Sequence, residues 1–246
     1  MNTFIRVLSS ERLKMSKSNL WLLTLGSPLL ALLVGLLTNS AKDASGYMVL
    51  MSTMSLFHAL LFLPILTGIF SSFICRYEHV GGGWKSLLSL PVSRTSVFTA
   101  KFLIVAALLA LTQLLFLGSF LIASQVKGIH EPFPWAMLTR SIIGGWVACL
   151  PLAALQLGFS LRWASFAAPL VVNVIFTVPN ILVINSDKIR PFYPWAQPIQ
   201  AMIPASSTNI GSFGFNLSFE SLMITVVGSF VLFFAAGLIY FNRREI

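Results

Sequence analysis

Long apolar runs separated by short polar intervals dominate the pattern of the chain. A hydrocarbon core about 30 Å thick takes about 20 helical residues to cross, and six runs reach that length. They lie near residues 19–37, 48–75, 99–124, 141–160, 164–185 and 220–241. The pattern therefore predicts an all-α, polytopic membrane protein with six transmembrane helices, organised as a single transmembrane domain over residues 1–246.

The segment before the first run, residues 1–18, is mixed in character. It carries basic residues and Glu11 among apolar residues such as Phe4 and Leu8, which predicts a weakly amphipathic helix at the cytoplasmic surface. A signal peptide is the competing interpretation. Because the polar segment is long and the apolar run after it reaches spanning length, we expect a retained anchor.

The composition agrees with a membrane protein, and the positions of the basic residues then predict the topology. Hydrophobic residues make up 57% of the 246 positions and charged residues 9%, far from the balance of soluble domains. An even number of spans puts both termini on one side. That side would hold most of the basic residues, namely Arg6, Arg12, Lys14, Lys17, Arg76, Lys85, Arg94, Lys101, Arg162, Arg243 and Arg244. The positive-inside rule then makes both termini cytoplasmic.

The net charge of +9 also raises the question of nucleic acid. A nucleic-acid-binding surface needs a polar domain to carry a basic stripe, and the pattern offers none. We therefore expect no nucleic-acid partner. Cys75 and Cys149 have no metal-like spacing, and each lies in or beside an apolar run, so we expect buried small hydrophobic residues.

The polar interval from Arg76 to Lys101 is both basic and patterned. Trp84, Leu87 and Leu88 are spaced to share one face of a short helix. Pro91 would end that helix, because proline lacks the backbone donor and restricts the residue before it. Ser93 is a candidate N-cap for the next span, accepting from the backbone of Thr95 or Ser96. We predict a short cytoplasmic helix between spans two and three.

The same interval contains, in order, an acidic residue, a glycine-rich turn, a Trp-Lys pair, the run LLSLPVSR and a lysine in the next span. This order resembles the intracellular loop of type-2 ATP-binding-cassette exporter permeases, and it is most similar to the small permeases of lantibiotic immunity and bacitracin resistance. In that family the loop is a coupling element that docks on a separate ATPase subunit. The resemblance implies a set of coupling residues: Glu78, Gly82, Trp84, Lys85, Leu87, Leu88, Pro91 and Arg94.

The resemblance also implies a function and partners. The chain would be the permease subunit of an exporter in the cell membrane, surrounded by lipid and paired with a second permease, either another copy or a sister subunit. The cargo in the resembling family is typically an amphipathic antimicrobial peptide such as a lantibiotic. Another amphiphile, a drug or a lipid, is the alternative cargo.

No nucleotide-binding motif of the type G-x-x-x-x-G-K-[ST] occurs in the chain, and the glycines 81–83 are followed by Trp84. We therefore expect no cofactor in this chain, and the resemblance assigns ATP and Mg²⁺ to the partner ATPase.

Glu78 and His79 are the neighbouring polar residues that most suggest a functional site. The family resemblance would let Glu78 face the ATPase or contact Arg76 or Arg94, whereas a plain solvated helix end is the other interpretation. A zinc or catalytic site is disfavoured because no further ligands follow at suitable spacing.

Polar residues inside the predicted spans are the remaining candidates, and they are His58, Gln113, Asn173 and Asn180. A polar side chain at membrane depth is costly unless it faces the bundle, so each should contact another helix or line a path. An intramembrane enzyme is disfavoured because His58 is the only titratable side chain well inside the spans. A scaffold or sensor without transport is the third possible function.

Overall fold

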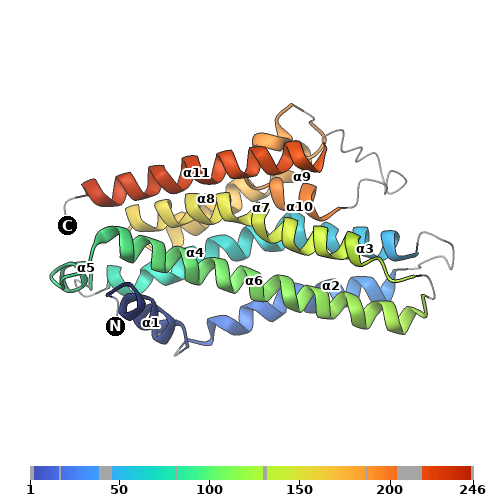
Figure 1. Cartoon of the computed structure of the whole chain (residues 1–246), viewed down its shortest axis with the longest axis horizontal. Coiled ribbons are helices and arrows are strands. Elements are labelled where there is room, and N and C mark those ends of the chain that lie inside the picture. Colours follow the sequence, from blue (N-terminus) through green and yellow to red (C-terminus); the bar gives the residue numbers. More distant parts are fainter. Residues whose placement is uncertain are drawn as a thin grey trace.

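The structure, a computed structural model, describes residues 3–16, 18–38, 46–80, 83–129, 132–186, 188–203 and 218–244. All regular elements in these ranges are helices, and the long ones run side by side in one elongated bundle (Figure 1). In order they are α1 (Thr3–Ser16), η1 (Asn19–Leu22), α2 (Leu23–Leu37), α3 (Gly46–Phe57), η2 (His58–Phe62), α4 (Leu63–His79), α5 (Gly83–Leu88), α6 (Arg94–Lys127), α7 (Trp135–Arg162), α8 (Ala167–Thr177), α9 (Asn180–Val183), η3 (Arg190–Phe192), α10 (Gln197–Met202) and α11 (Phe219–Arg243).

Within the described residues, five helical stretches are long and apolar enough to cross a membrane. They cover Asn19–Leu37, Gly46–His79, Arg94–Lys127, Trp135–Arg162 and Phe219–Arg243. Each contains one of the runs expected from the sequence, and several extend a turn or more beyond it. The expectation of an all-α, polytopic membrane protein is confirmed.

The expected span at 164–185 is different, because it is two helices rather than one. The apolar stretch Ala167–Val183 is shorter than the five others, and α8 gives way to α9 next to Pro179. Proline has no N–H to continue the helical ladder. The hydroxyl of Tyr193 donates to the Phe176 carbonyl near this break, at 2.6 Å. The stretch is shorter than the expected 164–185 and is interrupted at Pro179, and the count of six spans stays a prediction.

The second long stretch contains a π-helical turn, η2, between α3 and α4. Pro64 lies two residues after this turn and cannot donate to a carbonyl in the preceding turn. The Leu60 carbonyl instead accepts a hydrogen bond from Asn180 Nδ2 at 2.9 Å. A wider turn before a proline commonly relieves the steric clash between the proline ring and the preceding turn. Here it also leaves the Leu60 carbonyl as a hydrogen-bond acceptor for α9.

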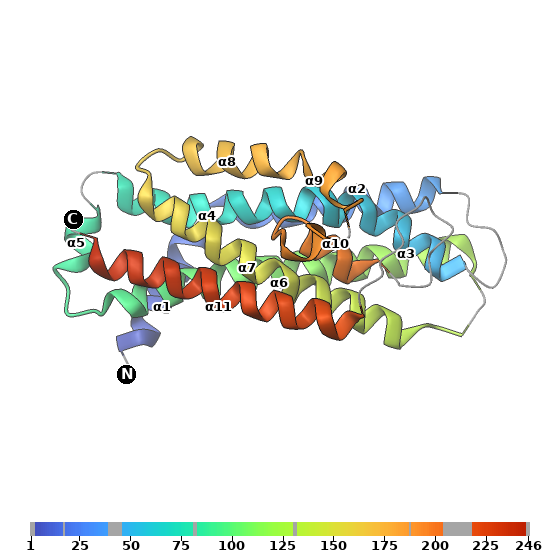
Figure 2. The same ribbon diagram turned by 90° about the horizontal axis from the view of Figure 1, so that it is seen from above.

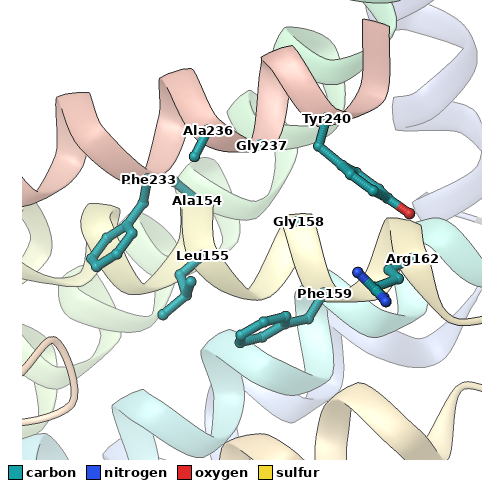
Figure 3. A pocket seen from close by; sticks show the side chains of 9 residues that line it. All are labelled: Ala154, Leu155, Gly158, Phe159, Arg162, Phe233, Ala236, Gly237 and Tyr240. Carbon is teal, nitrogen blue, oxygen red and sulfur yellow. The ribbon is translucent and has the colours of Figure 1, made fainter. Parts of the chain in front are cut away.

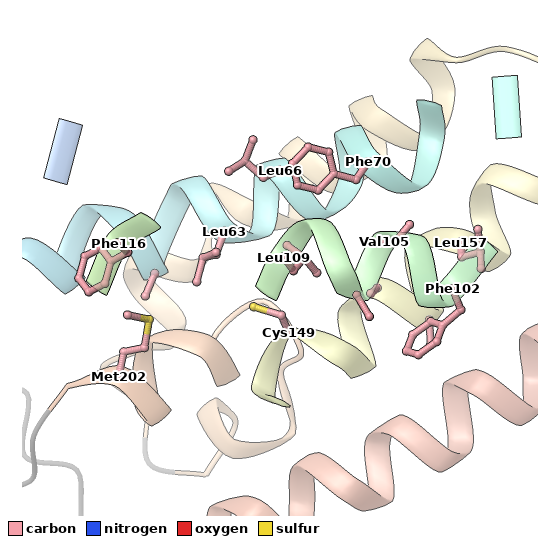
Figure 4. Close-up of a cluster of buried hydrophobic side chains, with 14 of the residues drawn as sticks. Leu63, Leu66, Phe70, Phe102, Val105, Leu109, Phe116, Cys149, Leu157 and Met202 are labelled. Atoms are coloured by element: carbon pink, nitrogen blue, oxygen red, sulfur yellow. The ribbon is translucent and has the colours of Figure 1, made fainter. Parts of the chain in front are cut away.

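The centre of the bundle is filled by apolar side chains from α4, α6 and α7, with α10 closing one side (Figure 4). Leu63, Phe70, Leu109, Cys149 and Met202 belong to this cluster and are almost fully buried. The helix α7 packs against α4, α6, α10 and α11, so it is the central helix of the fold. Cys75 and Cys149 are both buried and unpaired, as the sequence predicts.

The two ends of the bundle differ. Both chain ends lie at the end that carries α5, whereas α3 and α10 lie in the other half (Figures 1 and 2). The expected N-terminal helix is present as α1, and it turns Val7, Glu11 and Met15 inward. The short helix α10, by contrast, is buried along its whole length.

Candidate functional site

The short helix between the second and third long stretches is α5, and it is tightly held. Trp84 is 5% exposed and packs edge-on against Phe241 of α11, with 5.3 Å between ring centroids. The backbone at Gly83 approaches α4 so closely that a Cβ there would lie 2.8 Å from the Glu78 Cα. The apolar face expected on this helix therefore packs, through Trp84, into the chain's own bundle.

A chain of hydrogen bonds extends this contact to α7. Trp84 Nε1 donates to His79 Nδ1 at 3.1 Å, and His79 Nε2 donates to the Ser160 carbonyl at 2.8 Å. Ser160 lies in the last turn of α7, where carbonyls have no partner within the helix. The histidine thus links α5 to α4 and α7, with the proton on Nε2.

Arg94, the first residue of α6, bonds to the end of α11. Its Nη1 donates to the carbonyls of Phe241 and Asn242 at 3.0 and 3.1 Å, and also to that of Arg244. A guanidinium is well placed at a helix C-terminus, since it supplies donors to unpaired carbonyls and complements the helix dipole. The start of α6 and the end of α11 are therefore fixed to each other.

The other residues predicted to couple to an ATPase differ in their exposure. Lys85 and Pro91 are exposed, and Leu87 is partly buried against the core. Ser93 caps α6 by accepting from the Ser96 backbone, as the sequence predicts. Gly82 and the Leu88 side chain lie outside the described part. Among residues 83–91, the exposed side chains that a partner could contact are Lys85, Ser86, Ser89, Leu90 and Pro91.

A buried ion cluster lies beside α5 and joins α1, α4 and α6. Lys101 Nζ lies 2.8 Å from a carboxylate oxygen of Glu11 and 2.8 Å from one of Glu78. Lys14 Nζ approaches the other oxygens of the same two carboxylates, at 2.7 and 2.5 Å. The four side chains form a closed ring of alternating charge. We call Glu11, Lys14, Glu78 and Lys101 the ion cluster.

The ion cluster is well compensated. Lys101 is 0% exposed, and its third donor goes to the Ile74 carbonyl at 2.9 Å, so all three ammonium donors are used. Two carboxylates and two ammonium groups leave no net charge to bury, which is the condition under which buried ions are tolerated. The Lys101 ammonium also lies 5.7 Å from the Trp84 ring centroid, so the cluster and α5 are in contact.

This arrangement corrects the expectations for Glu78. The carboxylate is 3% exposed, so it is neither a solvated helix end nor directly open to a partner. Its ion-pair partners are Lys14 and Lys101 rather than Arg76 or Arg94. Arg76 lies over the Phe73 ring, at 5.8 Å.

The pairing of Glu11, Lys14 and Lys101 was not predicted from the sequence. The available signals were a lone acidic residue in a basic amphipathic segment and a lysine seven residues inside an apolar helix.

Two asparagines attach the broken helix α8–α9 to the rest of the bundle. Asn173 Nδ2 donates to the Pro64 carbonyl at 2.8 Å, while its Oδ1 accepts from Gln156 and from the Trp195 indole. Asn180 Nδ2 donates to the carbonyls of Leu60 and Trp195, both at 2.9 Å. Both residues therefore make the interhelical contacts expected of buried polar groups in spans.

The other two polar residues predicted in spans also contact neighbouring helices. His58 Nδ1 lies 2.6 Å from Ser27 Oγ, and its ring stacks on Phe116 with 4.2 Å between centroids. Gln113 Nε2 donates to Met202 Sδ at 3.3 Å. Within the described ranges, no group of three or more His, Cys, Asp and Glu side chains is arranged to hold a metal ion.

The structure is that of a multi-pass membrane protein. It has long apolar helices, buried amide side chains that bond neighbouring helices, and an ion cluster without net charge at one end. Residues 7–180 match the model of the ABC-2 family transporter proteins, so the chain belongs to this family. It is also similar to the bacitracin transport permease protein BCRB of Bacillus licheniformis. The two are 23% identical over 198 residues, which cover 79% of this chain and 91% of that protein. ABC-2 permeases are the membrane components of transporters, so this chain is not itself the catalytic subunit.

Proposed function

We propose that this chain is the permease of an exporter driven by a separate ATP-binding-cassette ATPase, which docks on the end of the bundle formed by α5 and the Ser89–Pro91 turn. The permease works as a pair, with either a second copy or a sister subunit. Its cargo is an amphipathic antimicrobial peptide of the bacitracin or lantibiotic type, expelled to protect the cell.

The observation that carries the docking proposal is the way α5 is attached. Trp84 contacts α11 directly, reaches α7 through His79 and lies beside the ammonium of Lys101 in α6. Because the helix has no independent freedom, a displacement imposed on its exposed surface must move the ends of these long helices with it. Transport requires two bundle states that differ in cargo affinity, and a rigid attachment lets ATPase closure select between them.

The cytoplasmic location of this end is supported by charge. Arg6, Arg12, Lys85, Arg162 and Arg243 are all exposed, and each lies in a segment that reaches the α5 end. Positive residues favour the cytoplasmic side. A Lys85→Cys variant tests this directly with a thiol reagent that does not cross membranes. Labelling should require broken cells, and labelling of intact cells would reject the orientation. The native Cys75 and Cys149 are buried, so background should be low.

The docking surface can be tested without disturbing the fold. Lys85 is exposed, and Leu90 is 54% exposed. In the purified permease–ATPase complex, Lys85→Glu combined with Leu90→Asp should weaken association and abolish stimulation of ATP hydrolysis. Lys188→Glu is the matched control, since Lys188 is also exposed but lies in the 188–203 segment remote from α5. Equal loss in both variants, or no loss in either, would reject this surface as the docking site.

The cargo proposal rests on the relative, whose name states bacitracin transport. Cells that express the permease with its ATPase should tolerate several-fold more bacitracin or lantibiotic than cells that carry the Lys85→Glu, Leu90→Asp variant. Unchanged tolerance to both peptides, with ATPase stimulation intact, would reject the cargo while leaving the coupling proposal standing.

A further inference from the structure

A pocket of about 190 Å³ opens between α7 and α11 in the half of the bundle that carries α5 (Figure 3). Its lining is almost entirely apolar, with Phe159 and Phe233 along its length. The polar exceptions are Arg162 and Tyr240, which lie together at one end. We call this pocket the α7–α11 groove.

The groove exists because small residues face each other at the helix contact. A Cβ on Gly237 would lie 2.9 Å from the Phe98 ring, so Gly237 is needed for packing against α6. A Cβ on Gly158 would meet only the Gly237 Cα, at 3.8 Å. That distance is an ordinary van der Waals contact, and Gly158 lines the groove, so a side chain added there would take up part of the space in the groove.

The polar end of the groove carries an available positive charge. The Arg162 side chain is exposed, and within the described residues its guanidinium takes part in no hydrogen bond or ion pair. Arg243, the last residue of α11, is also exposed, and Arg244 follows it. The last turn of α7 and the end of α11 are joined there by a bond from Arg244 to the Leu161 carbonyl. The apolar α7–α11 groove therefore ends at the guanidinium of Arg162 and the phenol of Tyr240, with further positive charge nearby.

A second pocket provides a comparison within the same molecule. It lies between α6 and α7, has a volume of about 210 Å³ and is lined by Leu114, Leu117, Trp135, Leu138, Thr139, Ile142 and Ile143. No charged residue lines it. The nearby Arg140 lies instead over the Phe219 ring, 4.1 Å from its centroid. The two pockets match in size and apolar character, and they differ in the cationic end.

We propose that the α7–α11 groove binds an anionic phospholipid, with an acyl chain along Phe159 and Phe233 and the headgroup phosphate on Arg162 and Tyr240. Both helices of the groove are long enough to span the membrane, and α11 exposes the apolar side chains of Val231, Leu232 and Ile239, so bilayer lipid can reach the groove. A guanidinium at the membrane surface pairs strongly with phosphate, and a phenol can donate to the same group. The site requires neither the cargo nor the ATPase of the proposed function.

Native mass spectrometry of the full-length permease in detergent tests the proposal. Phosphatidylglycerol and phosphatidylcholine with identical acyl chains are titrated separately, and bound molecules are counted. The unmodified protein should retain one phosphatidylglycerol in preference to phosphatidylcholine. Arg162→Gln should reduce that preference about fivefold, the size expected for one arginine beside an anionic lipid surface. Gly158→Leu should remove the retained lipid of either headgroup, because its side chain occupies the groove.

Two matched variants keep the test specific. Gly228→Leu adds the same side chain to α11 at an exposed position with nothing within 4 Å, and Arg140→Gln removes a cation from the other end of α7. Both should behave like the unmodified protein. If Gly158→Leu retains lipid as Gly228→Leu does, or if Arg162→Gln keeps full headgroup preference, the proposal is wrong. It is also wrong if Gly158→Leu dissociates dimers without changing the lipid count, since the groove would then hold a second copy.

Discussion

Replacing Lys101 with methionine would remove an ammonium while keeping a side chain of similar length at a fully buried position. Lys101 is hydrogen-bonded to Glu11, to Glu78 and to the Ile74 carbonyl. After the change, Lys14 is the one cation left within the ion cluster to face the two buried carboxylates. The ion cluster would pass from net neutral to a net negative charge, and the Ile74 carbonyl would lose this donor.

The expected loss follows from the cost of breaking a buried ion pair. Removing one partner typically destabilises a protein by about 3–5 kcal/mol, because the remaining charge is left buried without compensation. At about 2–4 °C per kcal/mol for domains of 150–250 residues, the melting temperature should fall by about 6–20 °C. Removing one ion of each sign restores neutrality, so Lys101→Met combined with Glu78→Gln should lose clearly less than Lys101→Met alone.

Thermal unfolding of the purified protein in one detergent measures these differences. Lys85→Met is the control, since it removes an exposed lysine from the neighbouring helix and should change the melting temperature little. The reasoning fails if Lys101→Met is as stable as Lys85→Met. It also fails if the double variant shows the summed loss of its two single variants, because the four charges would then not act as one compensated group.

Three further changes test other contacts. In Gly68→Ala the new Cβ would lie 2.2 Å from Asn173 Nδ2, so we expect a loss of about 1–3 kcal/mol in thermal unfolding, against little change for Gly228→Ala; equal stability of the two would contradict the packing. Asn180→Leu leaves the carbonyls of Leu60 and Trp195 without this donor and should lower the free energy of unfolding by about 1–3 kcal/mol. An unchanged melting temperature would show that other contacts hold α9. Trp84→Phe keeps an aromatic ring but loses the bond to His79, so it should cost about 1 kcal/mol and reduce ATPase stimulation, and full stimulation would argue against transmission through His79.

Much of the fold could be predicted because its determinants are local. Apolar runs of spanning length locate the long helices. Ser93, whose hydroxyl accepts from the Ser96 backbone N–H, caps the start of α6 and is recognisable in the sequence as an N-cap candidate. The short α5 between Gly83 and Leu88 follows from the spacing of its apolar residues and from Pro91. The break at Pro179 was visible in the sequence as a proline, but hydropathy alone does not distinguish a kinked span from two short helices.

The candidate site was harder to predict because its contacts are distant in sequence. Glu11 and Glu78 meet through Lys101, which is 90 and 23 residues away from them. Periodicity assigned Trp84 to an apolar face, but it could not indicate that the face packs against Phe241 near the other end of the chain. The sequence around Arg94 is likewise that of a surface cation, and it gives no sign that the guanidinium bonds to the carbonyls at the end of α11.

The order of the ion cluster along the chain has a consequence for biogenesis. Glu11, Lys14 and Glu78 all precede Lys101, and chains are synthesised from the N-terminus. When the lysine of α6 leaves the ribosome, both carboxylates that neutralise it are therefore already made. Lys101 can therefore pair with both carboxylates as α6 enters the bilayer, before α11 has been translated.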